Sequence, residues 1–398
     1  MKVGIAGAGI MGRLLAFALQ KAGWDVTLFD VANQSSVSFV AAGLLTPLVE
    51  LEKNDLIIYQ LGSVALKEHW PCLLQALDSD IFFKHDGSIV LAHPRDSAEL
   101  TRLMCLIADK LNATAIPSSP AILSRSVTPH LLRGLLDDGK PIATLGMTKR
   151  HEMTAIKGSD LSEAYQRLDQ AALLQLEPSL TSFQTGFYFP NEGQLDCQAV
   201  MSVLTSLLKE KTHYHECAVD DVSPGVIKTV HETHYFDLVC DCRGLGATQF
   251  FPDLRSIRGE LVWLTAPHVD IRRPIRLMHP RYSLYIVPRP HHVYLVGASE
   301  IEADDHSEIS VRTLLELLTA AYSVHPGFAE ARVIKTSTHC RPALADHLPR
   351  IKYTDGLLAI NGLYRHGFLI APTLLVEAMA WITSGLSHVH YPQLWEKI

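Results

Sequence analysis

The sequence predicts an α/β fold in which a Rossmann-like nucleotide-binding unit is interrupted by antiparallel-sheet insertions. Two observations predict it. The first 30 residues follow the order strand, glycine turn, helix, strand, which is how a parallel nucleotide-binding sheet begins. Between residues 213 and 298, strand patterns and turns succeed one another with no helical stretch, as in an antiparallel sheet.

The N-terminal glycine turn carries the strongest functional signal. An apolar strand at residues 3–6 breaks into glycines, and a helical stretch follows over residues 13–22. Gly7 permits the tight turn, Gly9 lets the backbone approach a pyrophosphate, and Gly12 lets the helix pack on the strand. A second apolar run ends in Asp30, where a carboxylate can accept hydrogen bonds from an adenosine ribose. The pattern predicts a dinucleotide site.

The later elements are predicted from periodicity and turn residues. Residues 81–92 predict a hairpin with an Asp86-Gly87 turn. Asp196 is placed to cap a long helix. Helical patterns cover residues 56–77, 97–111, 161–176, 197–211, 311–324 and 373–382. Strand patterns cover residues 186–195, 213–222, 226–232, 236–240, 258–264, 283–289, 293–298 and 357–360.

Composition excludes several classes of protein. The chain has 398 residues, 47% of them hydrophobic and 19% charged, which argues against disorder. A net charge of −7 without a basic stripe makes nucleic acid an unsuitable partner. No apolar run reaches the roughly eighteen residues that a membrane helix needs, so no membrane is expected. Seven scattered cysteines favour reduced thiols and a cytoplasmic location. The histidine pairs lack further ligands at a familiar spacing, so no metal is expected.

Several motifs, in chain order, resemble those of the D-amino-acid oxidase and glycine/sarcosine oxidase superfamily. They are the glycine turn, Ala41-Ala42-Gly43, Glu177-Pro178, Gly186-Phe-Tyr-Phe-Pro-Asn-Glu-Gly193 with Asp196, Arg258-Gly259-Glu260, Tyr285-Ile-Val-Pro288-Arg289 and Gly297-Ala298. The final motifs, Cys340-Arg341-Pro342 and Gly362-Leu-Tyr-Arg-His-Gly-Phe-Leu-Ile-Ala-Pro372, are most similar to glycine oxidase, whose product feeds thiamine biosynthesis. The resemblance runs from residue 2 to about residue 382.

The resemblance implies a Rossmann-like FAD-binding domain with a mixed sheet and an inserted antiparallel-sheet substrate domain. Residues 1–80, 141–252 and 335–398 would form the discontinuous FAD-binding domain. Residues 81–140 and 253–334 would form the substrate domain and lie over the flavin.

The same resemblance implies bound FAD. The expected cofactor contacts are Gly7, Gly9, Ile10, Met11, Gly12, Asp30, Ala41, Ala42, Gly43, Leu44, Val219, Gly244, Gly362, Leu363, Tyr364, Arg365, His366, Gly367, Phe368 and Leu369. Val219 matches a main-chain contact to the adenine, although a plain buried strand valine explains it equally well. Sarcosine oxidases attach their flavin to a cysteine near the position of Cys340. The segment Gly362–Pro372 at the C-terminal end, the C-terminal string, resembles glycine oxidase more than sarcosine oxidase. Noncovalent FAD is therefore expected, with Cys340 as a buried thiol.

The implied chemistry is oxidation of an amine or a glycine-like amino acid by hydride transfer to flavin N5, with O₂ reoxidising the flavin to give H₂O₂ and an imine. Arg341 matches the family's carboxylate-binding arginine, and a guanidinium can donate two parallel hydrogen bonds to a carboxylate. Arg365 matches an arginine near the substrate, and Tyr285 matches an active-site tyrosine. The alternatives are ordinary salt bridges for the arginines and a core aromatic for the tyrosine.

Two departures from the family pattern stand out. Asp241-Cys242-Arg243-Gly244 replaces the usual small-residue turn, and its acid and arginine can pair with each other or bind a phosphate. Glu300 occupies a position that is apolar in glycine oxidase. A carboxylate there would repel a substrate carboxylate or bind a cationic group, unless it is a solvated strand-end residue.

Three functions therefore stay open. The first is a small-molecule amino-acid or amine oxidase that uses O₂. The second is a maturation flavoprotein that oxidises a side chain of a partner protein, and the two departures at 241–244 and 300 are its only sequence support. The third is a dehydrogenase that passes electrons to another acceptor. The sequence leaves the oligomeric state undetermined.

Overall fold

The computed structural model describes residues 1–31, 36–113, 161–280 and 284–398. The sequence also predicts a segment interrupted by prolines at 118–149 and a polar turn at 33–36. The first of these, the predicted domain boundary at 140/141 and most of the second lie outside the described residues. Within the described residues the strands form four sheets, two large and two small.

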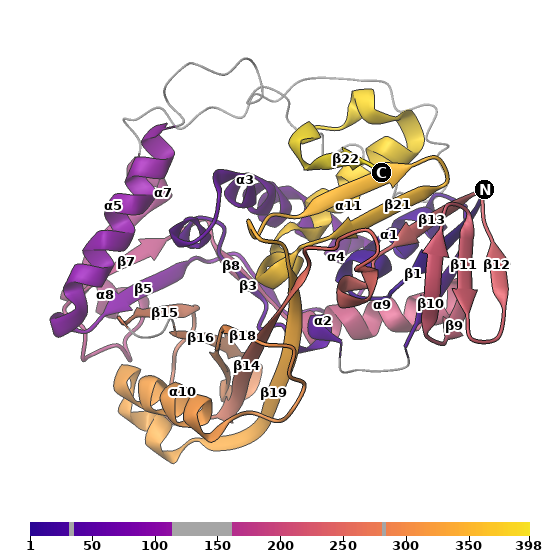
Figure 1. Cartoon of the computed structure of the whole chain (residues 1–398). Coiled ribbons are helices and arrows are strands. Elements are labelled where there is room, and N and C mark those ends of the chain that lie inside the picture. The colour runs from indigo at the N-terminus through magenta and orange to yellow at the C-terminus, as the bar shows by residue number, and fades with distance from the viewer. Residues whose placement is uncertain (32–35, 114–160, 281–283) are drawn as a thin grey trace.

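The nucleotide-binding half is built on a seven-stranded mixed sheet assembled from distant parts of the chain (Figure 1). All neighbouring strands are parallel except the β20–β21 pair. In spatial order the strands are β22 (Trp395–Lys397), β20 (Arg350–Thr354), β21 (Leu357–Asn361), β13 (Leu238–Asp241), β1 (Lys2–Ala6), β2 (Asp25–Asp30) and β9 (His213–Glu216). N-terminal and C-terminal segments therefore share one sheet.

Helices pack on this sheet through apolar faces. α1 (Ile10–Lys21) contacts both α9 (Cys197–Lys211) and α11 (Gly367–Ser384). Asp196 caps α9 as predicted, because its side chain accepts the Ala199 N–H. The predicted helix at 56–77 forms as α3 (Leu56–Val64), a π-helical segment (Ala65–His69) and α4 (Trp70–Leu77). Pro71 is the second residue of α4, just after the π segment, and a π bulge is one way to accommodate a missing backbone N–H.

The second large sheet has nine strands and is antiparallel except where β5 and β15 run parallel. In spatial order its strands are β18 (Ile301–Glu302), β14 (Arg255–Thr265), β17 (Val293–Gly297), β16 (Leu284–Arg289), β15 (Ile275–Met278), β5 (Ser88–Ala92), β7 (Thr185–Phe189) and β6 (Gln166–Asp169), with β19 (Arg332–Ala343) paired to β14. β6 and β7 lie within the segment predicted for the FAD domain, yet they pair with the other sheet. The two-domain division stays a prediction.

Smaller elements complete the described residues. One small sheet orders β10 (Val219–Ser223), β11 (Val226–Thr229) and β12 (Thr233–Tyr235). The other orders β3 (Leu44–Leu45), β8 (Gly193–Leu195) and β4 (Phe83–Lys84). The remaining helices are α2 (Val37–Val40), α5 (Ser97–Ala113), α7 (Leu161–Ala164), α8 (Gln170–Leu176) and α10 (Val311–Val324). The expectation that no apolar run is long enough to span a membrane is wrong by length and composition, because Tyr364–Ser384 meets that test. However, 72% of its eighteen-residue apolar window is buried inside the fold, as in a core helix.

Two predicted elements are wrong. The strands at 81–92 do not pair as a hairpin, because β4 pairs with β8 whereas β5 pairs with β7. Gly87 instead donates its N–H to the Glu192 carbonyl, so the two strands diverge into different sheets. The predicted helix at 161–176 is interrupted by β6, and Asp169 caps the new helix α8 by accepting the Ala172 N–H.

Candidate active site

The N-terminal turn has the geometry of a phosphate site. Gly7 adopts a φ of +91°, which favours glycine. A Cβ on Gly12 would overlap the Gly7 carbonyl oxygen, so the turn packs on the helix without space for a side chain. A Cβ on Gly9 would meet only Ser38 Oγ, at 3.4 Å. The fold itself therefore leaves room at Gly9, where a pyrophosphate is expected. Helix geometry leaves the N–H groups of Met11 and Gly12 without intrahelical acceptors.

Asp30 ends β2 beside this turn, and its carboxylate is fixed in place. Oδ2 accepts hydrogen bonds from Arg13 Nη2 at 3.0 Å and from the Tyr214 hydroxyl at 2.9 Å. Arg13 is buried and also donates to the Ala8 carbonyl at 2.6 Å. A buried guanidinium in the first turns of α1 thus orients the carboxylate predicted to bind the ribose.

The Asp241-Cys242-Arg243-Gly244 departure is satisfied within the protein. Arg243 Nη2 lies 2.7 Å from Asp241 Oδ2, and Arg243 Nε lies 3.0 Å from Asp241 Oδ1. Val219 is close by, since its carbonyl is 3.5 Å from Arg243 Nη1. The Gly244 carbonyl accepts from Asn361 at 2.8 Å. The acid and the arginine therefore pair with each other, and Val219 and Gly244 lie outside the main pocket.

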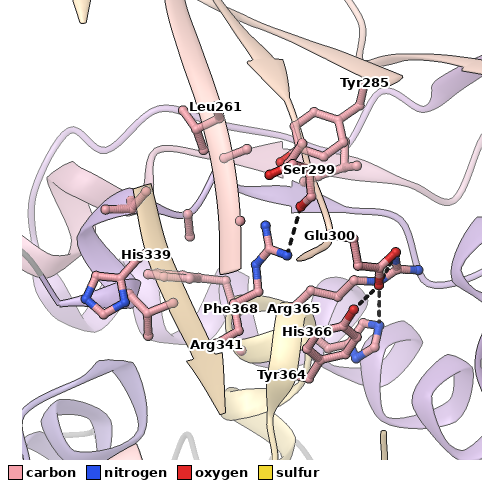
Figure 2. A pocket seen from close by; sticks show the side chains of 18 of the residues that line it. Leu261, Tyr285, Ser299, Glu300, His339, Arg341, Tyr364, Arg365, His366 and Phe368 are labelled. Carbon is pink, nitrogen blue, oxygen red and sulfur yellow. Dashed lines mark hydrogen bonds and ion pairs between the residues drawn. The ribbon is translucent and has the colours of Figure 1, made fainter. Parts of the chain in front are cut away.

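The main pocket has a volume of about 470 Å³ and lies between strands of the nine-stranded sheet and the N-terminal ends of α1 and α11 (Figure 2). Its lining includes residues that were expected to contact the cofactor and residues that were expected to contact the substrate. From the cofactor set it includes Ile10, Ala41, Ala42, Gly43, Leu44, Tyr364, Arg365, His366, Gly367, Phe368 and Leu369. From the substrate set it includes Tyr285, Glu300, Arg341 and Arg365. All four predicted substrate residues are thus brought together.

The Ala41-Ala42-Gly43 loop is held tightly at one wall. Gly43 has a φ of +73°, and a Cβ there would overlap the Leu195 carbonyl oxygen. Arg289 Nη2 donates to the Leu195 carbonyl at 2.7 Å and also to the Ala42 carbonyl. The backbone of this loop is consequently rigid where a flat ring system would approach it.

The C-terminal string forms the opposite wall. Gly362 has a φ of +76°, and a Cβ there would lie 2.8 Å from a Leu344 methyl carbon, so the turn requires glycine. A short 3₁₀ turn at Tyr364–His366 follows, and α11 starts at Gly367. The N-terminal end of an eighteen-residue helix therefore points at the pocket, where its partial positive charge favours negative charge on a bound group.

Arg341 projects from β19 toward the pocket (Figure 2). Its one hydrogen-bond partner among the described residues is the Ser299 carbonyl, 3.4 Å from Nη1. A Cβ on Gly259 would overlap the guanidinium, so glycine at that position makes room for it. Burial lowers the pKa of Arg341 despite the opposing effect of Tyr285. Burial likewise raises the pKa of the Tyr285 hydroxyl, which stays protonated and able to donate.

Glu50 is the centre of a buried charge cluster that the sequence did not predict. Arg365 Nη2 lies 2.6 Å from Glu50 Oε2, and His366 Nε2 lies 3.0 Å from the same oxygen. Burial would raise the pKa of Glu50, but Arg365, His366 and Arg276 outweigh it and hold the pKa well below its usual range. Glu50 is therefore a carboxylate, and Arg365 is neutralised by it.

Two more charged contacts surround this cluster. Arg276 Nη2 lies 2.7 Å from Glu52 Oε2. Glu300 Oε2 lies 2.7 Å from Lys53 Nζ, while its Oε1 lies 3.6 Å from Arg365 and accepts from the Tyr364 hydroxyl. The only sequence signal for these residues was the charged segment Glu50-Leu51-Glu52-Lys53 directly after a small apolar loop. Its partners come from β15 and from residues near 300 and 365, so no local pattern reveals the cluster.

The residues present fit FAD. The chain has a turn that excludes side chains, a fixed carboxylate at the position predicted for the ribose, and a rigid glycine loop. These features adjoin a pocket at a helix N-terminus. Cys340 lies apart from that pocket. Its thiol faces the carbonyls of Ala303 and Asp305, at 3.7 and 3.5 Å, whereas its neighbours His339 and Arg341 line the pocket.

The same thiol forms a possible metal-binding group with Asp304 and His306. The three donor atoms lie within 4.8 Å of one another, and two of the three residues are exposed. Since this set provides three donors rather than four, the expectation of no metal stays a prediction.

Comparison with known proteins matches the chain to oxidoreductases in each case. A family model described as FAD dependent oxidoreductase, DAO, matches residues 2–374. A Rhizobium etli protein described as a candidate thiamine biosynthesis oxidoreductase, ThiO, is 31% identical over 95% of each chain. Glycine oxidase of Geobacillus kaustophilus is 23% identical over 93% of this chain and 89% of its own.

Solved structures show the same fold. The crystal structure of the Geobacillus kaustophilus glycine oxidase matches with a TM-score of 0.75 and 19% identity, covering 99% of this chain and 97% of that one. Iminodiacetate oxidase from Chelativorans sp. BNC1 also matches with a TM-score of 0.75 and 19% identity, covering 99% of each chain.

Proposed function

The chain belongs to the DAO family of FAD-dependent oxidoreductases, and from this membership we propose that it oxidises a small glycine-like amino acid to the imine. It is an oxidoreductase of the glycine oxidase and ThiO type that acts on amino-acid-like substrates. We propose in addition that the substrate carries one carboxylate beside the reacting amine. We also propose that O₂ is the electron acceptor.

One observation carries the proposal. The described cations that lie inside the pocket each have a carboxylate partner, except Arg341. Arg312, also in the lining, is exposed on α10. A partly buried guanidinium with one long contact to a carbonyl is suited to bind one carboxylate through two parallel hydrogen bonds.

The chain's own residues then act by positioning. Arg341 binds the substrate carboxylate, and Tyr285, which lines the same pocket, donates its hydroxyl hydrogen to the same group. Because the carboxylate is fixed, the carbon beside the nitrogen is held in one orientation. When bound, FAD would supply the two-electron acceptor for a hydride from that carbon, and O₂ would then take up both electrons with two protons as H₂O₂. A neutral amine supplies the electron density, so no strong side-chain base is needed.

The alternative functions have less support. The internal Asp241–Arg243 pair removes one of the two sequence features that favoured a partner-protein substrate. The other feature, Glu300, has its own partners inside the pocket.

Anaerobic flavin bleaching tests the proposal. The holoprotein is mixed without O₂ with glycine, sarcosine or D-alanine, and with dimethylamine, which lacks the carboxylate of sarcosine. We expect at least one amino acid to bleach the 450 nm flavin band, and O₂ to restore it with one H₂O₂ per flavin. Bleaching that O₂ does not reverse would favour another acceptor. No bleaching by any amino acid would favour a protein substrate.

A further inference from the structure

We infer that Glu300 limits the substrate to a single carboxylate, because it repels a second carboxylate and pairs with Lys53, the cation that this carboxylate would need. This inference rests on the proposed function in taking Arg341 as the anchor of the first carboxylate. Glu300 then determines specificity without contacting the reacting atoms.

The contacts of Glu300 join three separate parts of the chain at the pocket. Lys53 Nζ lies 2.7 Å from one carboxylate oxygen. Arg365 Nη1 lies 3.6 Å from the other, which also accepts from the Tyr364 hydroxyl. All four residues line the pocket, and Figure 2 shows Glu300 beside Tyr364 and Arg365. Both oxygens of Glu300 therefore have donors already.

Glu300 is also close to the anchor. The residue before it, Ser299, accepts the hydrogen bond from Arg341. The Glu300 carboxylate is ionised, since burial raises its pKa but Arg365, Lys53 and Arg341 together lower it below its usual value. An ionised carboxylate thus lies next to the place where the substrate carboxylate is bound.

A second carboxylate on the ligand would meet two obstacles. It would be repelled by Glu300, and like charges placed together at a binding interface are strongly disfavoured. The two cations that contact Glu300 would not be free to bind it either, because Lys53 is paired with Glu300 and Arg365 with Glu50. A cationic ligand group is not favoured either, since it would have to displace Lys53. Exclusion of dicarboxylates is therefore the effect that these contacts support.

The energetic role of the Lys53–Glu300 pair is consistent with specificity rather than stability. The two side chains are 41% and 32% exposed, and ion pairs exposed to this degree contribute little to folding. Removing the charge of Glu300 should hence leave the fold intact. It would also release Lys53 to bind a carboxylate. Specificity set by repulsion changes when the repelling group is removed.

The experiment compares ligands that differ by one carboxylate in oxidised holoprotein. Acetate and malonate are titrated while the flavin absorption spectrum is followed, which requires no turnover. In Glu300→Gln the ratio of malonate to acetate affinity should rise about tenfold. Glu300→Ala serves as a second variant should glutamine fold poorly. Glu302→Gln is the matched control, because Glu302 lies two residues on, pairs with Arg255 and does not line the pocket.

The outcomes separate the two proposals. An unchanged malonate-to-acetate ratio in both Glu300 variants would overturn the inference, as would an equal rise in Glu302→Gln. Anaerobic reduction by sarcosine is measured on the same samples. Failure of sarcosine and other amino acids to reduce the wild-type flavin would refute the proposed function alone, because the carboxylate ratio does not depend on oxidation.

Discussion

Arg13 is the single residue on which the adenosine end of the site most depends. Its guanidinium bonds Asp30 and the Ala8 carbonyl, and both donors to Asp30 use Oδ2. We predict that Arg13→Met weakens FAD binding about tenfold or more, because a charge-assisted hydrogen bond that orients the ribose-binding carboxylate is lost. Titration of apoprotein with FAD, followed by fluorescence, measures the dissociation constant. Tyr214→Phe, which removes only a hydroxyl, should have the smaller effect. Equal FAD affinity in Arg13→Met and wild type would contradict this role.

Glu192 should make stability depend on pH. Burial raises the pKa of this carboxyl from its ordinary 4.5 to about 8, although it accepts hydrogen bonds from Val49 N–H and the Ser88 hydroxyl. Between these pH values the unfolded chain loses the proton and the folded chain keeps it. The free energy of unfolding therefore falls as pH rises from about 4.5 to about 8, and the contribution is constant above that.

Glu192→Gln isolates this effect. The amide stays neutral and can still accept from Val49, so the variant should lose this part of the pH dependence and gain stability relative to wild type as pH rises. Urea unfolding at several pH values measures the free energy of unfolding of the wild type and of the variant. A difference between wild type and variant that does not change with pH would show that the carboxyl is ionised in the folded protein.

Individual site residues were predictable where a motif surrounds them. Arg341, Tyr285 and Arg365 were found through matching neighbours, and all three line one pocket. Glu50 and Lys53 were not found, because their roles depend on partners more than 200 residues away. Charge pairing across a fold leaves no periodic signal in a sequence.

At the scale of elements, the geometry of the N-terminal strand–turn–helix predicts that substituting Gly9 and substituting Gly12 have different effects on FAD binding and on stability. Gly9→Val should abolish FAD binding with a small loss of stability, because only Ser38 is near its Cβ position. Gly12→Val should destabilise the apoprotein itself by about 1–3 kcal/mol or more, since its side chain would overlap the Gly7 carbonyl.

Thermal unfolding of apoprotein and flavin content after purification distinguish these effects. Gly9→Val should keep most of the wild-type apoprotein Tm and contain no FAD, whereas Gly12→Val should lose both. Full flavin occupancy in Gly9→Val would mean that the pyrophosphate does not bind at this turn.

Elements with strong local signals were predicted well. The predicted Asp196 cap and the helix at 311–324 agree with the structure, and the last helix, predicted at 373–382, spans Gly367–Ser384. The hairpin at 81–92 was wrong because an Asp-Gly turn specifies a reversal but not the partner of each strand. The helix at 161–176 was wrong because four residues were recruited as β6 at the edge of the nine-stranded sheet. In both segments the structure was determined by pairing with strands that the local sequence does not specify.

At the scale of the whole molecule, the interleaved chain explains why the site is assembled from distant segments. β14 and β19 form a long antiparallel ribbon that brings Arg341 to the pocket beside the C-terminal string (Figure 1). No local stretch of sequence specifies that ribbon, and residues 332–343 were not predicted to be a strand. The sequence predicted that an antiparallel sheet forms, but it did not predict the order of the nine strands.

The placement of Cys340 predicts how the cofactor is held. Since its thiol faces the carbonyls of Ala303 and Asp305 and does not line the pocket, FAD should be released on acid precipitation. A colourless pellet under a yellow supernatant is the expected result. A yellow pellet that becomes colourless in Cys340→Ala would show a covalent thioether instead.

The central claim is that Arg341 anchors a substrate carboxylate in the pocket, and anaerobic stopped-flow reduction of the flavin by the amino acid that bleaches it tests this claim most directly. Loss of one partner of a desolvated charge pair costs about 2–5 kcal/mol. Arg341→Met should therefore weaken substrate binding about 30-fold or more while FAD stays bound. Arg332→Met, which alters an exposed arginine of the same strand, should match wild type. Saturation of Arg341→Met at the wild-type substrate concentration would contradict the claim.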